Sequence, residues 1–147
     1  MQQHRRFVQE HSTDRFSRRY MEWIGHYEFG QNFRPIDFGG WLGAGPIPAA
    51  PDGTFWMKYW DAAYRYAIEN RRENVHFVDF DALLRGGRKI LEVLADVTRV
   101  RDRERFLAAT DVLRAPTSRP AAADACDPAV RAAVEQTHIR LKALAIG

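Results

Sequence analysis

Residues 55–84 read FWMKYWDAAYRYAIENRRENVHFVDFDALL, and their hydrophobic period changes partway along. From Trp56 to Ala67, aromatic and alanine side chains recur every three or four positions, which predicts a helix with a broad apolar stripe. Residues 74–80 instead bring the β-branched or aromatic side chains of Val75, Phe77, Val78 and Phe80 close together, which favours a parallel-sheet strand buried on both faces. The stretch therefore predicts a helix followed by one strand of a parallel sheet.

Helical periodicity also surrounds this stretch. Residues 3–29 are expected to be helical, with a break at 11–14 where Ser12 or Thr13 would cap the second part. The other expected elements are helices from Asp52 or Thr54 onward, at about 88–97, at about 101–112 and at 128–145 after the capping pair Asp127-Pro128, and a loop at 113–126. We therefore expect a mostly α-helical chain with about one parallel-sheet strand.

The predicted strand has no visible neighbour. A lone strand leaves its N–H and C=O groups unpaired, and burying each of them without a partner costs on the order of 1–3 kcal/mol. The first helix also begins almost at Met1, with no capping residue before it. Both features indicate that residues 1–147 form a single partial domain, the C-terminal part of a larger α/β domain whose other strands lie outside the chain.

Residues 30–53 hold most of the glycine and proline, and they are expected to form a long connecting loop. Gly40 and Gly45 stand at the spacing of a phosphate-binding loop, but Pro46 and Ile47 occupy the positions that need Lys and Ser or Thr. The loop is therefore not expected to bind phosphate.

Composition narrows the possible functions. The 147 residues carry a net charge of +3, and no run of about 18 apolar residues is present, so no membrane partner is expected. A single cysteine and the absence of a signal-peptide pattern favour the cytoplasm. All but three of the 22 basic residues are arginine, but they are interleaved with acids, which argues against a nucleic-acid partner.

Candidate metal ligands and acid pairs are few. The five histidines stand at no recognised ligand spacing, so no metal is predicted. Asp79 and Asp81 lie on the same side of the expected strand end. They are interpreted either as a carboxylate pair or, more simply, as caps of the following turn.

The order of aromatic helix, short strand, acid, leucine pair and amphipathic helix resembles a known family. Residues 55–97, with Phe80-Asp81 and the leucines that follow, are similar to the C-terminal half of sulfotransferases that use 3′-phosphoadenosine 5′-phosphosulfate (PAPS). HRRFVQEH at 4–11, RRYMEWIGHYEFG at 18–30 and DPAVRAAVEQTHIRLKALA at 127–145 resemble bacterial members. The resemblance implies an α/β fold of the P-loop-like sulfotransferase type, in which a sulfonyl group passes from PAPS to a hydroxyl or amine acceptor.

The resemblance also implies roles for particular residues. They are Phe80, Arg5 and Arg6 for the cofactor and Trp41, Trp56 and Tyr59 for a small-molecule acceptor. For each, a simpler interpretation is core packing or a solvated helix charge. The family's phosphosulfate loop and its 3′-phosphate Arg…Ser segment are absent, and no residue matches a catalytic base. The chain is therefore expected to be inactive alone.

Two further possibilities stay open. A homo-oligomer or a complementing N-terminal half could supply the missing parts of the domain. Alternatively, the chain could be a non-enzymatic helical module that binds a protein partner through exposed aromatic side chains.

Overall fold

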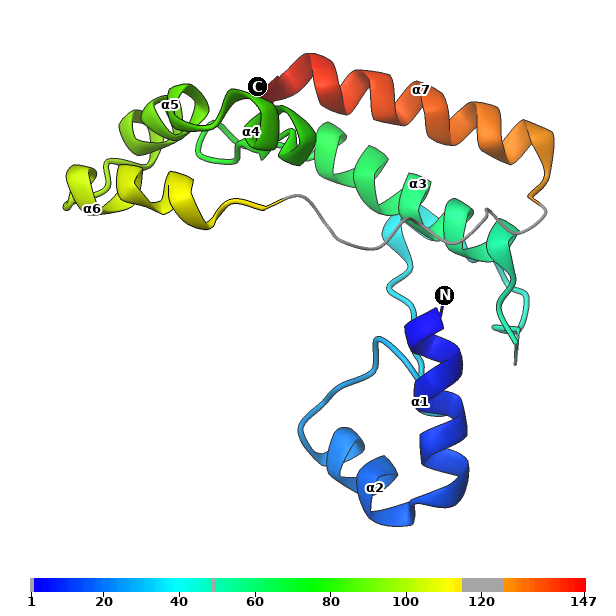
Figure 1. Ribbon diagram of the computed structural model, residues 1–147. Coiled ribbons are helices and arrows are strands. Elements are labelled where there is room, and N and C mark those ends of the chain that lie inside the picture. The colour runs from blue at the N-terminus through cyan, green and yellow to red at the C-terminus, as the bar shows by residue number, and fades with distance from the viewer. Residues whose placement is uncertain (1, 49, 115–125) are drawn as a thin grey trace. The chain divides into compact units, whose positions relative to one another are not determined.

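The computed structural model describes residues 2–48, 50–114 and 126–147, and it is mostly helical with one small parallel sheet (Figure 1). The chain divides into two compact units. The first comprises residues 1–66 and 124–134, and the second comprises residues 67–123 and 135–147. The expected single partial domain stays a prediction. In the part of the chain that the structure describes, no helix is long and apolar enough to cross a membrane.

The first unit begins with two helices that pack against each other, α1 (Gln2–Thr13) and α2 (Arg15–Trp23) (Figure 1). The cap of α2 is Asp14, whose carboxylate accepts a hydrogen bond from the Phe16 N–H at 2.9 Å. The prediction of Ser12 or Thr13 as cap is wrong, because both hydroxyls donate back to carbonyls of α1. The predicted helical span to residue 29 is too long.

The expected connection at 30–53 contains one short 3-10 helix, η1 (Phe38–Gly40), and leads into α3 (Gly53–Glu69). The Asp52 carboxylate accepts from the Phe55 N–H at 2.8 Å, so the predicted start of this helix is confirmed. The last helix, α7 (Pro128–Leu144), is capped in the same way by Asp127, which accepts from the Ala129 N–H at 2.8 Å. Of the loop predicted at 113–126, residues 115–125 lie outside the described residues.

The second unit contains α4 (Phe80–Gly86), α5 (Arg88–Thr98) and α6 (Arg103–Ala108), followed by the 3-10 helix η2 (Ala109–Val112). In Figure 1, α5 lies beside α4 and α6, and all three contribute to one apolar core. Its buried members are Leu83, Ile90, Leu91 and Leu107. The amphipathic pattern expected at 88–97 is confirmed on its Ile90 and Leu91 face.

The sheet corrects the expectation of a lone strand. Strand β1 (Phe77–Val78) pairs in parallel with β2 (Ala145–Ile146), with Phe77 opposite Ala145 and Val78 opposite Ile146. A strand partner is thus present within the chain, directly after α7. The strand is also shorter than residues 74–80, and Val78 is exposed, so burial on both faces is not observed.

Asp79 ends β1 and begins α4. Its Oδ1 accepts from the N–H groups of Asp81 and Ala82, at 2.9 and 3.1 Å. The backbone hydrogen bond from Ala82, with the nearby Lys142 ammonium 3.7 Å away, lowers the pKa of Asp79. The interpretation of Asp79 as a cap is therefore confirmed, and Phe80 lies in a helix instead of at the end of a strand.

Candidate functional site

Three residues predicted to contact an acceptor come together in the first unit. The Trp41 and Tyr59 rings are stacked, with centroids 5.3 Å apart and an interplanar angle of 17°, and Trp56 lies 6.2 Å from Tyr59. The Tyr59 hydroxyl accepts from the Ile36 N–H at 3.2 Å, and the Trp41 Nε1–H donates to the Ile36 carbonyl at 2.9 Å. These two bonds satisfy both backbone polar groups of Ile36, and the bond to Tyr59 attaches the connecting loop to α3.

The cluster extends beyond the predicted residues. Phe33 lies 5.1 Å from Trp56 and makes edge contacts with Phe55 and Tyr59. Residues 55, 56 and 59 fall on adjacent turns of α3, so the helical spacing presents their rings to the loop together. Ring pairs at these separations add to the stability from apolar burial.

Two histidines of α1 belong to the same site, although the sequence pattern did not single them out. His4 and His11 are seven residues apart, on one face of the helix, and only 4% and 3% exposed. The Nδ1 atom of each accepts from a backbone N–H, of Gly30 and Gln31 respectively, at 3.3 Å. Because Nδ1 accepts in both rings, the ring hydrogen is assigned to Nε2.

The two rings differ in their surroundings. His4 makes edge contacts with Phe33 and Trp56, at 5.1 and 5.4 Å between centroids. The Nε2 atom of His11 is buried and has no hydrogen-bond partner among the residues that the structure describes. A buried unpaired donor of this kind lowers stability, so His11 is held in place by packing and by its Nδ1 bond.

A hollow of about 330 Å³ opens beside His4. Its lining residues are His4, Val8, Gly30, Gln31, Phe33, Ile47 and Pro48. This volume is at the lower end of the range for small-molecule sites, and the lining combines apolar side chains with the polar groups of His4 and Gln31. Ile47 and Pro48 come from the connecting loop, which therefore forms one wall of the hollow.

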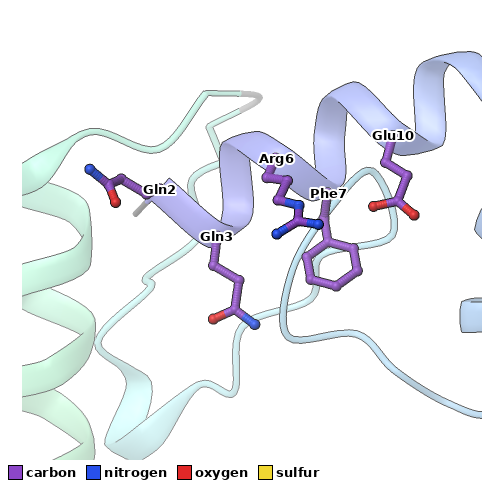
Figure 2. A pocket seen from close by; sticks show the side chains of 5 residues that line it. All are labelled: Gln2, Gln3, Arg6, Phe7 and Glu10. Carbon is purple, nitrogen blue, oxygen red and sulfur yellow. The ribbon is translucent and has the colours of Figure 1, made fainter. Parts of the chain in front are cut away.

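The residues predicted to contact the cofactor do not come together in one site. Figure 2 shows Arg6 beside a separate hollow on α1, with Gln3 and Phe7 pointing to the same side of the helix. Glu10 also lines this hollow, and its carboxylate opposes the binding of an anion. Arg5 is exposed on α1, and Phe80 is 55% exposed at the first position of α4 in the second unit. Phe80 and the two arginines therefore belong to different units. The simpler expectation that Phe80 packs in the core is wrong, because its side chain is exposed.

No group of three or more His, Cys, Asp or Glu side chains suited to a metal ion occurs within residues 2–48, 50–114 and 126–147. Comparison of the chain with protein-family models, curated proteins and solved structures found no match. The functional argument therefore rests on the hollow beside His4 and on the aromatic cluster that adjoins it.

The environment of His4 predicts loss of stability in acid. Burial lowers the pKa of His4 from its ordinary value of 6.5. The unfolded chain therefore binds a proton at higher pH than the folded chain, and the contribution of His4 to stability is lost as pH falls below about 6.5, through the lower folded pKa. All four tryptophans lie in the first unit, so urea unfolding followed by tryptophan fluorescence will report this loss.

The variant His4→Gln provides the control, since an amide oxygen can still accept from Gly30 but does not titrate. We expect its stability to fall less steeply than that of the unmodified chain between about pH 7 and pH 5. If the free energies of unfolding of the two proteins fell equally with pH, groups other than His4 would cause the acid sensitivity.

Proposed function

We propose that this chain supplies the acceptor-binding part of a sulfotransferase-type protein that transfers a sulfonyl group from PAPS to a hydroxyl or amine acceptor. The observation that carries the proposal is the hollow beside His4, whose lining residues His4 and Phe33 contact Trp56. Trp41, Trp56 and Tyr59 are not themselves among its lining residues. The resemblance of residues 55–97 to the C-terminal half of such enzymes supplies the reaction class. The single cysteine favours a cytoplasmic location for the protein.

The hollow suits an acceptor with an apolar body and one polar group. Val8, Phe33 and Ile47 would contact the body, while Gln31 and His4 provide the polar groups of the lining. In-line transfer needs the acceptor oxygen or nitrogen to be held in a fixed position, which a walled hollow on α1 would provide.

The residues of this chain do not by themselves fit PAPS. Charge on the transferred group and its leaving oxygen needs cationic and backbone donors, which a phosphate-binding loop normally supplies. Gly40 and Gly45 are followed by Pro46 and Ile47, so residues 40–47 lack the Lys and Ser or Thr of such a loop. Cofactor binding is therefore assigned to a complementing N-terminal half or second chain, with Arg5, Arg6 and Phe80 as its proposed contributors from this side.

The acceptor site predicts stabilisation by a small aromatic alcohol. With 2-naphthol at about 100 times its dissociation constant, the first unit should gain about 2.7 kcal/mol in free energy of unfolding. Adenosine 3′,5′-bisphosphate, tested separately, should leave the chain alone unchanged. Urea unfolding followed by the fluorescence of the first unit's tryptophans, with ligand blanks subtracted, measures both effects.

A matched pair of variants locates the binding. Ile47→Phe adds volume inside the hollow and should abolish the effect of 2-naphthol, whereas Ile36→Phe, on the same connecting loop but outside the lining, should retain it. Equal stabilisation of both variants by 2-naphthol would show that the hollow is not the acceptor site. A nucleotide effect as large as that of the alcohol would contradict the assignment of cofactor binding to another chain.

A further inference from the structure

Helix α2 presents its apolar side to solvent. No residue of α2 is buried, and Phe16 and Trp23 are 77% and 82% exposed, with Tyr20 between them. The three rings follow one another along the helix at centroid distances of 6.2 Å, and Phe16 and Tyr20 are nearly parallel. We call Phe16, Tyr20 and Trp23 the α2 aromatic stripe. An aromatic row this exposed on a folded unit marks an interaction site.

Arg18 and Ser17 of α2 contact other parts of the first unit. Arg18 donates to the Gln31 side chain at 3.3 Å, and its carbonyl accepts from Asn32 at 3.2 Å, so this side faces the connecting loop. Ser17 approaches Glu10 of α1 at 3.5 Å. These contacts attach α2 to α1 and to the connecting loop through residues outside the stripe.

Charge is arranged unequally along the stripe. At 100° per residue, Arg15 and Arg19 fall on one side of it, with Glu22 next to Arg15 but farther from the stripe than Arg19. Glu10 of α1 lies beyond Ser17 on the other side. A partner that carries carboxylates along one edge would meet the two arginines.

We propose that α2 docks, through this stripe, into an apolar groove of a partner protein whose rim carries carboxylates. The stripe residues stand at positions i, i+4 and i+7, which is the anchor spacing of helices that insert into hydrophobic grooves. Aromatic side chains and arginine are also the residues that contribute most to protein interfaces. The docking surface is separate from the hollow beside His4 and holds whether or not the acceptor site is correct.

Two other occupants fit less well. In an antiparallel pair of α2 helices centred on Tyr20, Arg19 would face Arg19 of the second copy. An anionic membrane would repel Glu10 beside the stripe, whereas a partner with carboxylates along one edge only leaves the Glu10 side free of negative charge.

Calcium-loaded calmodulin is a suitable probe, because calcium opens in it a methionine-rich apolar groove with an acidic rim. Titration of fluorescently labelled calmodulin with the full chain should raise its anisotropy, with a dissociation constant that is roughly micromolar. Removal of calcium should abolish binding. Trp23→Ser should weaken it about thirtyfold, the loss expected for one anchor residue.

The control variants distinguish specific binding through the stripe from non-specific hydrophobic binding and from an effect of net charge. Phe80→Ser removes another exposed aromatic ring, in the second unit, and should leave binding unchanged. The double variant Arg15→Glu, Arg19→Glu should weaken binding about tenfold or more, while Glu22→Gln should not weaken it. Because the stripe is exposed, the unfolding free energies of these variants should stay close to that of the unmodified chain.

Four results would overturn the proposal. The first two are the absence of binding at about 100 μM chain and equal binding by Trp23→Ser and Phe80→Ser. Another is self-association of the chain alone in sedimentation equilibrium that Trp23→Ser abolishes, since a second copy would then be the occupant. The last is tighter binding to phosphatidylserine vesicles than to calmodulin, again lost in Trp23→Ser, which would identify a membrane surface.

Discussion

Replacing Gly30 with alanine should destabilise the first unit by about 3 kcal/mol. Gly30 has φ +84°, a conformation that L side chains rarely adopt, and an added Cβ would lie 2.6 Å from two atoms of the buried His11 ring and 3.2 Å from Phe7 Cβ. His11 cannot easily move aside, because its Nδ1 atom accepts from Gln31 and its ring packs on Phe7. The Gly30 N–H that donates to His4 would be displaced as well.

Gly43→Ala is the matched control. Gly43 also has a positive φ, +61°, but nothing lies within 4 Å of the position that a Cβ would take. Its substitution carries only the backbone penalty, about 1–2 kcal/mol. The measurement is the urea unfolding of both variants by tryptophan fluorescence, which follows the first unit. If the two substitutions cost the same, the contact between the loop and the α1 histidines would not be what holds this unit together.

Features set by neighbouring residues were predictable from the sequence. Asp52 and Asp127 were expected to begin helices, and each carboxylate accepts a backbone hydrogen bond from the first turn. The apolar face of residues 88–97 was expected from its period and is buried at Ile90 and Leu91. Capping and periodicity depend on a few adjacent residues, so a single sequence carries their full pattern.

Features set by distant residues were not predictable in this way. Strand β2 is two residues long, too short to show any period, and its pairing with Phe77–Val78 spans most of the second unit's sequence. The break after α1 was expected, but the capping residue was not, because Ser12, Thr13 and Asp14 are all good caps and the hydroxyls had nearer carbonyl acceptors.

In the candidate site, too, contacts between distant residues could not be predicted from local sequence patterns. The grouping of Trp41 with Trp56 and Tyr59 was expected only from the family resemblance, since no local pattern joins residue 41 to α3. His4 and His11 were judged as metal ligands and set aside, although their spacing of seven residues places them on one face of a helix with Phe7. Their role as acceptors for the Gly30 and Gln31 N–H groups depends on how the loop returns to α1, which sequence spacing does not reveal.

Leu107→Ala should destabilise the second unit by about 3 kcal/mol. Leu107 is among the most buried residues of the core, where it belongs to one cluster with Leu83, Ile90 and Leu91. Truncation would remove three carbons and leave a cavity that neighbouring helices can fill only in part. The second unit contains no tryptophan or tyrosine, so amide hydrogen exchange in α5 is the appropriate measurement. Its protection should fall by about two powers of ten, the equivalent of 3 kcal/mol.

Val93→Ala is the control, because Val93 lies on α5 of the same unit but is exposed, and its truncation should cost less than about 1 kcal/mol. Comparable losses for both variants would show that the cluster around Leu107 is not the core that stabilises this unit. Tryptophan fluorescence of Leu107→Ala adds an independent readout. An unchanged urea midpoint would mean that the two units unfold separately, whereas a parallel decrease would mean that the first unit depends on the second for its stability.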